Sequence, residues 1–237
     1  MARHIQRKDL KKDEVRETFA HGAEAVLSHQ TLAIYILAAA IVVAVGGFGW
    51  WTYAQRQSVA ASTAFDSAMR TFQIPSGTPP TPGETVYPDD TQKFTAAAQQ
   101  FSSVAAKYPR TRGGQLARYY QALSYEKINK NDDAKKLLQG IENGGEEEVA
   151  VSARFELAQL DDRTGQGDEA VKLYQQLIAQ PSILVPKPVA MLALATHYGQ
   201  NNPSEATKIY SQIKTEFPDT PIAEQADQAL ALLSGKS

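Results

Sequence analysis

The sequence contains no cysteine among its 237 residues. It therefore forms no disulfide bonds, holds no zinc through thiolates and has no cysteine nucleophile. A lipoprotein anchor is excluded as well, because that anchor is attached to a cysteine. Charge is nearly balanced, with 24 basic and 26 acidic residues and a formal net charge of −2. A nucleic-acid surface needs a clustered excess of Lys and Arg, so this balance argues against nucleic acid as the main partner.

Sequence patterns that carry catalysis are missing too. There is no Gly-rich phosphate loop, no G-x-S-x-G motif and no spacing typical of metal ligands. The acidic run 146–148 precedes a helical segment, where negative charge complements the helix dipole. The acidic pairs at 132–133 and 161–162 are interpreted as turn residues that cap the next helix. His197 has no catalytic partner along the sequence and is interpreted as a surface or packing residue. We therefore predict no catalytic residue, no metal, no cofactor and no enzymatic activity.

Charged residues are also absent from Ala25 to Gln55. Within that stretch Leu32 to Trp51 is mostly apolar, and a helix of this length rises about 30 Å, the thickness of a bilayer's hydrocarbon core. Apolar residues occupy every face, so the segment is not an amphipathic surface helix. We predict a transmembrane helix over 31–54. Aromatic residues at its C-terminal end suit the membrane interface, namely Trp50, Trp51 and Tyr53.

The flanking charges predict the orientation of this helix. Six basic residues lie within 1–30, whereas Arg56 and Arg70 are the basic residues between the helix and residue 92. The positive-inside rule makes 1–30 a cytoplasmic stub and places the rest of the chain outside the cytoplasm. A cleaved signal peptide is the competing interpretation, with a small-x-small site at 58–60. That leader would be too acidic and its apolar core too long, so we expect an uncleaved single-pass anchor.

The remainder of the chain repeats with a period of about 36 residues. Each of four segments has an alanine, then a large aromatic or aliphatic residue four positions later, then an aliphatic residue three positions further. Small alanines suit close helix crossings, and the larger residue fills the wider gap beside them. The four segments contain Ala97, Phe101 and Val104; Ala134, Leu138 and Ile141; Ala170, Tyr174 and Leu177; and Ala206, Tyr210 and Ile213.

This spacing resembles the tetratricopeptide repeat, a pair of antiparallel helices. That family also has an alanine followed three residues later by an aromatic in each first helix, as at Ala122 and Ala195 here, whereas Asp161 replaces the aromatic in the third unit. The resemblance implies an all-α fold in which degenerate helix pairs stack into an α-solenoid over 91–237.

Three further segments complete this predicted organisation. Residues 55–74 have no helix breaker and are expected to form a helical stalk that doubles as the first repeat helix. The proline-rich segment 75–90 is expected to be an irregular loop. Pro221 to Leu233 has an apolar face and acids on the other side, so we predict that it caps the solenoid.

Stacked helix pairs expose the first helix of each pair along a concave groove. Exposed aromatics among polar groups suit a protein or peptide ligand. The alternative is that Tyr119 and Phe155 pack against the neighbouring unit instead. Aligning Ala122 with Ala158 places five candidate partner-binding residues on the groove, namely Tyr119, Glu126, Phe155, Gln159 and Asp162.

The order of these parts resembles the ancillary SecYEG translocon subunit family. The likeness rests on the short charged stub, the aromatic residues 48–55 after a Gly-rich span, and the alanine-rich stalk; the proline-rich loop departs from it. The resemblance implies a bacterial inner-membrane protein with periplasmic repeats. Its partners would be translocon subunits and a periplasmic chaperone, with no nucleic acid or small-molecule substrate. The alternative is an envelope scaffold for the cell-division machinery or peptidoglycan synthesis.

Overall fold

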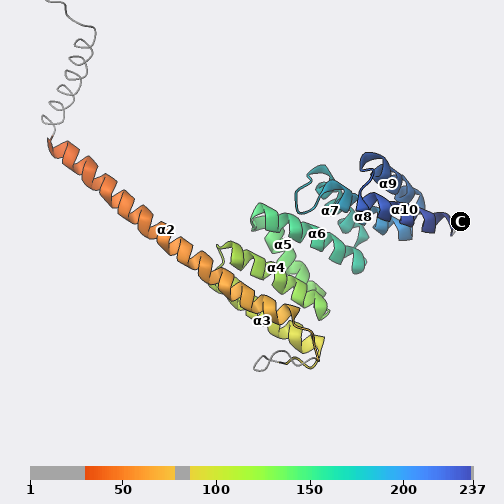
Figure 1. Cartoon of the computed structure of the whole chain (residues 1–237), viewed down its shortest axis with the longest axis horizontal. Coiled ribbons are helices and arrows are strands. Elements are labelled where there is room, and N and C mark those ends of the chain that lie inside the picture. Colours follow the sequence, from red (N-terminus) through yellow and green to blue (C-terminus); the bar gives the residue numbers. More distant parts are fainter. Residues whose placement is uncertain (1–29, 78–85, 236–237) are drawn as a thin grey trace, which may run out of the picture. The chain divides into compact units, whose positions relative to one another are not determined.

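The computed structural model describes residues 30–77 and 86–235 (Figure 1). The predicted cytoplasmic stub therefore lies almost wholly outside the described residues, as does the centre of the proline-rich segment. Within the described ranges the chain is all-α, as predicted, and contains nine helices. It divides into two compact units, residues 1–56 and 57–237, and the boundary falls inside the first helix.

The first helix, α2 (Gln30–Gln73), joins the predicted membrane segment and the predicted stalk without a break. It contains the one segment of the described chain with the length and composition needed to cross a membrane. The most apolar part of this segment is not buried within the protein. Trp50, Trp51 and Tyr53 are exposed at the C-terminal end of the predicted membrane span. Their rings lie beside one another and Phe48, with centroids 6.0 Å apart for Phe48 and Trp51 and 6.4 Å apart for Trp50 and Tyr53.

Eight shorter helices form the second unit together with the last part of α2. Helices adjacent in sequence pack against each other along the unit (Figure 1), which is the arrangement that the repeat predicted. Their bounds are α3 (Asp90–Lys107), α4 (Arg112–Lys127), α5 (Asn131–Gly144), α6 (Glu147–Arg163), α7 (Gly167–Ala179), α8 (Lys187–Asn201), α9 (Pro203–Glu216) and α10 (Pro221–Ser234).

Local sequence explains where these helices begin. Asp89, Thr111 and Thr220 each accept a hydrogen bond from a backbone N–H in the first turn of α3, α4 and α10. Proline stands in the first turn of α8, α9 and α10, where its missing N–H is not needed. Acidic residues occupy the first turn of α5, α6 and α7, where they complement the helix dipole.

The repeated positions form the core, as the sequence predicted. Every alanine of the four repeat segments is 0 % exposed, and the residues four and seven positions later are buried as well. Each helix pair contributes to its own cluster of buried side chains, and the clusters follow one another along the unit. The apolar face of α10 closes the last cluster through Ile222, Ala226 and Leu230, so this helix is the predicted cap.

The end of α2 belongs to the first cluster. Ala61 and Ala68 are buried there, and the rings of Phe65 and Phe72 lie 5.7 and 6.1 Å from the ring of Phe101 on α3. A Cβ atom on Gly113 of α4 would lie 3.0 Å from the backbone carbon of Ala61, so glycine permits this close helix approach. The segment of α2 from residue 57 onward therefore packs as a repeat helix.

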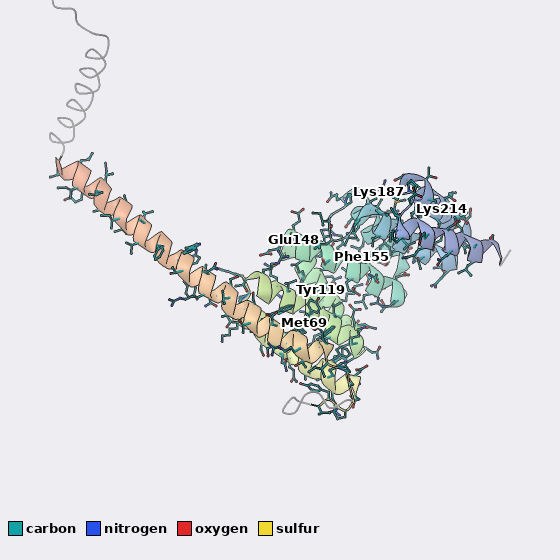
Figure 2. All side chains as sticks on the ribbon, in the orientation of Figure 1. Met69, Tyr119, Glu148, Phe155, Lys187 and Lys214 are labelled. Carbon is teal, nitrogen blue, oxygen red and sulfur yellow. The ribbon has the colours of Figure 1, made fainter. Side chains whose placement is uncertain are left out.

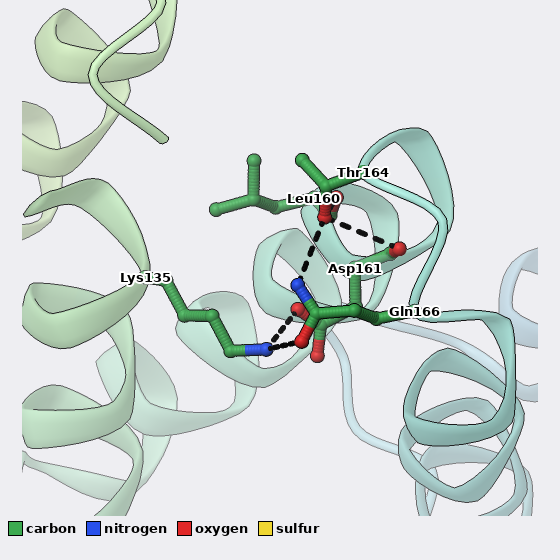
Figure 3. Close-up of polar contacts among 5 residues, drawn as sticks. All are labelled: Lys135, Leu160, Asp161, Thr164 and Gln166. Atoms are coloured by element: carbon green, nitrogen blue, oxygen red, sulfur yellow. Dashed lines mark hydrogen bonds and ion pairs between the residues drawn. The ribbon is translucent and has the colours of Figure 1, made fainter. Parts of the chain in front are cut away.

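The expectation about both acidic pairs is wrong. Asp132 and Asp133 lie inside the first turn of α5, and no side chain caps that helix. Asp161 and Asp162 do not lie in a turn that caps the next helix, because both are in the last turn of α6. The Asp161 carboxylate is 3 % exposed and lies 2.6 Å from the ammonium of Lys135 on α5 (Figure 3). Lys135 also donates to the side chain of Gln166, which in turn donates to Thr164 at 3.3 Å. This network joins the second repeat unit to the third.

Candidate partner-binding groove

A polar pocket opens where the first helices of three repeat units meet. Its volume is about 610 Å³, and its walls come from the end of α2, from α4 and from α6. Glu126, Glu156 and Arg163 supply its acidic and basic side chains together with Lys127 at the end of α4. The remaining lining residues are Phe72, Leu123, Asn129, Asn131, Leu160 and Thr164.

Glu126 and Glu156 share one basic partner in this pocket. The guanidinium of Arg163 pairs with Oε2 of Glu126 and lies 3.5 Å from Oε1 of Glu156. The Glu126 side chain is only 10 % exposed, whereas that of Arg163 is 52 % exposed. The other carboxyl oxygen of Glu126, Oε1, is buried without a hydrogen-bond partner among the described residues. One guanidinium therefore pairs with both carboxyl groups.

Burial is the main reason why the pKa of Glu126 is raised, and the Glu156 carboxylate adds to the effect. The charges of Arg163 and Lys127 act in the opposite direction, but the net result raises the pKa of Glu126 to about 7. Near neutral pH the Glu126 carboxyl group therefore retains a proton far more readily than an ordinary glutamate does. In its protonated form it can donate a hydrogen bond to Glu156.

Tyr119 lies close to this carboxyl pair. Burial raises the pKa of its hydroxyl, and the neighbouring Glu156 and Glu126 carboxylates raise it further. Its ring packs against the second core cluster and meets the ring of Tyr120 edge-on, with centroids 5.5 Å apart. Figure 2 places Tyr119 on α4 and Phe155 on the next first helix, α6. Of the five predicted groove residues, Glu126 is the one that lines the pocket.

The three predicted residues on α6 lie toward the following repeat unit. The Phe155 ring packs in the third core cluster, 6.2 Å between centroids from the ring of Tyr174. Asp162 is hydrogen-bonded to His197 of α8, with Oδ1 2.6 Å from Nδ1. Gln159 lies between these two in the sequence and is half-buried. The structure thus brings Tyr119 and Glu126 together, whereas Phe155 and Asp162 contact the following repeat unit from the adjacent face of α6.

The sequence interpretation missed Glu156 and Arg163. Each lies one residue C-terminal to a predicted residue, Phe155 and Asp162, and so on the adjacent face of α6. The sequence analysis interpreted His197 as a surface or a packing residue. Its side chain is 9 % exposed, so it is a packing residue. It does have a partner, Asp162, which sequence spacing alone does not reveal because 35 residues separate the two.

The described residues hold no group of three or more His, Asp or Glu side chains placed to bind a metal ion. Fold and groove together define a tetratricopeptide-like repeat protein with a long apolar N-terminal helix. The chain belongs to the tetratricopeptide repeat-like domain family, whose sequence model matches residues 28–182 and so includes the apolar part of α2.

Solved structures show the same fold. The nearly identical TPR-like repeats of a protein from Podosopora anserina, described as a kinesin light chain, superpose with a TM-score of 0.54 and 17 % sequence identity. The match covers 73 % of this chain and 86 % of that one. A single-residue variant of those repeats gives a TM-score of 0.55 over the same shares of both chains. No curated protein sequence matches the chain significantly.

Proposed function

We propose that the protein is a membrane-anchored scaffold that binds other proteins through its repeat unit at the extracytoplasmic face of a bacterial inner membrane. Tetratricopeptide repeat-like domains generally serve as scaffolds for protein–protein interaction, and the chain belongs to that family. The anchor is the apolar part of α2, from Leu32 to Trp51, and the basic stub sets its orientation.

The pocket between α4 and α6 carries this proposal. It combines exposed and buried polar groups of two repeat units, and its unpaired carboxyl oxygen on Glu126 is suited to a hydrogen bond from outside the chain. A pocket of this kind on the first helices of stacked pairs is accessible to an extended segment of another protein.

The partners that we propose are subunits of the secretion translocon and a periplasmic chaperone, to which the scaffold would hand emerging chains. This part rests on the resemblance of the sequence from the stub to the stalk. It agrees with an uncleaved apolar helix that would keep the repeat unit at the membrane where chains emerge.

Site-specific photo-crosslinking in intact cells tests the proposal. A photoreactive residue is placed at Asn129, Asn131 or Arg163 on the groove side, and at Gly140 on the exposed face of α5 as the control. We expect adducts from the groove positions that contain translocon subunits or a periplasmic chaperone, and none from Gly140. If the adducts instead contain division or peptidoglycan-synthesis proteins, and the protein concentrates at midcell, the translocon assignment is wrong. The protein is then a scaffold for cell division or peptidoglycan synthesis.

A further inference from the structure

The groove pocket contains a buried carboxyl oxygen for which the described part of the chain supplies no hydrogen-bond donor. Glu126 and Glu156 bring two carboxyl groups, whereas Arg163 is the one basic group paired with them among the described residues. The contact from Arg163 to Glu156 is long, at 3.5 Å, and Oε1 of Glu126 has no partner in the described part of the chain. A buried acceptor without a donor is costly, so the site favours any ligand that supplies one.

The groups around the carboxyl pair identify the charge of that ligand. On α4 the neighbours of Glu126 are Tyr119 and Lys127, and on α6 they are Glu156 and Arg163. Lys127 offsets part of this negative charge from an exposed position. An anionic ligand would still have to approach both carboxyl groups. A cation would instead replace the proton that Glu126 now retains. The other lining residues are uncharged, namely Phe72 of α2, the asparagines 129 and 131, Leu123, Leu160 and Thr164.

We propose that this pocket binds an arginine side chain of the polypeptide held in the groove, through Glu126 and Glu156 together. The proposal rests on the proposed function, because it assumes that the groove holds a polypeptide. Arginine fits better than lysine, since its planar guanidinium presents several N–H donors and can reach two carboxylates at once. The half-exposed Arg163 side chain can turn outward to admit the ligand.

Binding of arginine must then be coupled to loss of a proton. The ligand binds the ionised pair, so the proton on Glu126 competes with it. Because the pKa of Glu126 is raised to about 7, the ionised form predominates at pH 8 and is about a tenth of the total at pH 6. The affinity for arginine should therefore rise about tenfold between pH 6 and pH 8 and level off above that.

Carboxyl-carbon NMR of the full chain in detergent micelles, with ¹³C-labelled glutamate, tests the proposal. The probe is N-acetyl-arginine methylamide, and the control probe is the citrulline analogue, which has the same shape without the charge. We expect the arginine probe to shift the Glu126 and Glu156 carboxyl signals saturably, about tenfold more tightly at pH 8 than at pH 6. The citrulline probe should leave these signals unchanged.

Two variants complete the experiment. Glu126→Gln should weaken binding of the arginine probe at pH 8 at least about tenfold, since a charge-assisted pair is lost. Glu147→Gln, at an exposed position of α6 outside the pocket, should bind like the unmodified chain. The folded state of both is checked by helix content and melting temperature. An equal response to citrulline, equal binding by Glu126→Gln, or saturable binding of N-acetylglycine at Arg163 instead of the arginine probe would overturn the proposal.

The two proposals fail in different ways. If the groove positions crosslink to protein partners but the arginine probe does not bind, the assignment of arginine is wrong and the scaffold function stands. If the probe binds as described and no partner is crosslinked at the groove, the site is correct and the proposed function is wrong.

Discussion

Asp161 of α6 forms a buried ion pair with Lys135 of α5, with Oδ1 2.6 Å from Nζ, at the position where the repeat pattern would have an aromatic residue. The pair replaces apolar packing between two repeat units by a charge contact. The carboxylate is 3 % exposed and the lysine side chain 21 %. An acid in the last turn of a helix is unfavourable to the helix dipole, so the Lys135 ammonium also compensates for that position.

Removing one partner of this pair should destabilise the repeat unit strongly. Asp161→Ala leaves the Lys135 ammonium partly buried without its carboxylate, and we expect a loss of about 3 kcal/mol, because breaking a buried pair exposes the full cost of burying the remaining charge. Thermal unfolding of the full chain in mild detergent, followed by circular dichroism, measures the loss as a drop of about 6–12 °C.

A double variant and an exposed pair serve as controls. Asp161→Leu with Lys135→Met should recover most of the stability, since apolar groups of similar size often substitute well for a buried pair. Glu205→Ala breaks the exposed contact with Lys208, at 2.8 Å, and should cost less than about 0.5 kcal/mol. Similar losses for Asp161→Ala and Glu205→Ala would contradict the structural role of the buried pair.

The repeat period made the fold predictable from the sequence. Ala134 and Leu138 illustrate why: both are wholly buried, because the repeat pattern records the close helix crossing and the gap beside it. Helix ends were predictable where a cap is local, as at Thr220, whose hydroxyl accepts from the backbone N–H of Ala223 three residues later.

The pocket was less predictable, because it depends on contacts between repeat units. Arg163 and Glu126 are 37 residues apart, and their pairing follows from the rotation of α6 against α4. The difference between Phe155 and Glu156 is a single step around α6, about 100° of rotation. An alignment on Ala158 fixes which side of the helix is buried but does not decide which neighbouring helix each flank faces.

Two glycines should respond to alanine in opposite ways. A Cβ atom on Gly114 would lie 1.9 Å from the carbonyl oxygen of Tyr108, a backbone atom that cannot move aside easily. We expect Gly114→Ala to cost about 2–3 kcal/mol through overpacking. Gly140 is exposed within α5 and a Cβ there would touch nothing within 4 Å, so Gly140→Ala should stabilise by about 0.5–1 kcal/mol. Melting temperatures compare them, and a loss in both variants would contradict the prediction.

Stability should fall as the pH rises toward 7 because of Glu126. Its pKa is raised to about 7 in the folded chain and is near 4.5 when unfolded, so the folded state binds the extra proton between these values. The stability that this proton confers is complete below pH 4.5 and is lost as the pH rises to 7. We expect Glu126→Gln to be more stable than the unmodified chain at pH 8 by about 2 kcal/mol, allowing for solvent at the pocket mouth.

Melting curves at pH 5 and pH 8 measure this difference. The gain should be much smaller at pH 5, where the carboxyl of the folded chain is protonated and resembles the amide. Glu147→Gln serves as the matched control, because its side chain is exposed on α6, and its effect should not depend on pH in this way. A gain for Glu126→Gln of the same size at both pH values would contradict the assignment of the proton to Glu126.

The apolar part of α2 should hold the chain in the membrane. Replacing Ile41 and Val45 by aspartate puts two charges at its centre, at a cost of about 3 kcal/mol each, and we expect the chain to be released by carbonate extraction. The same change at Ser58 and Val59, beyond the predicted span, should leave the chain membrane-bound.

The orientation of the chain can be tested separately. Since the sequence has no cysteine, a single cysteine introduced at Ser182 reports orientation, and an impermeant maleimide should label it in intact spheroplasts. Labelling only after lysis would reverse the proposed topology.

The contact between Gly167 and His197 should couple the third and fourth repeat units. A Cβ atom on Gly167, the first residue of α7, would lie 2.7 Å from Cε1 of the His197 ring. That ring cannot turn away freely, because it is 9 % exposed and its Nδ1 is held 2.6 Å from Asp162. Gly167→Ala should therefore cost about 1–2 kcal/mol.

The double variant with His197→Ala serves as the control. The clash is absent there, so the cost of Gly167→Ala should vanish or change sign, since alanine is the better helix former. A double-mutant cycle of melting temperatures measures this coupling; purely additive effects would mean that the two residues do not constrain each other.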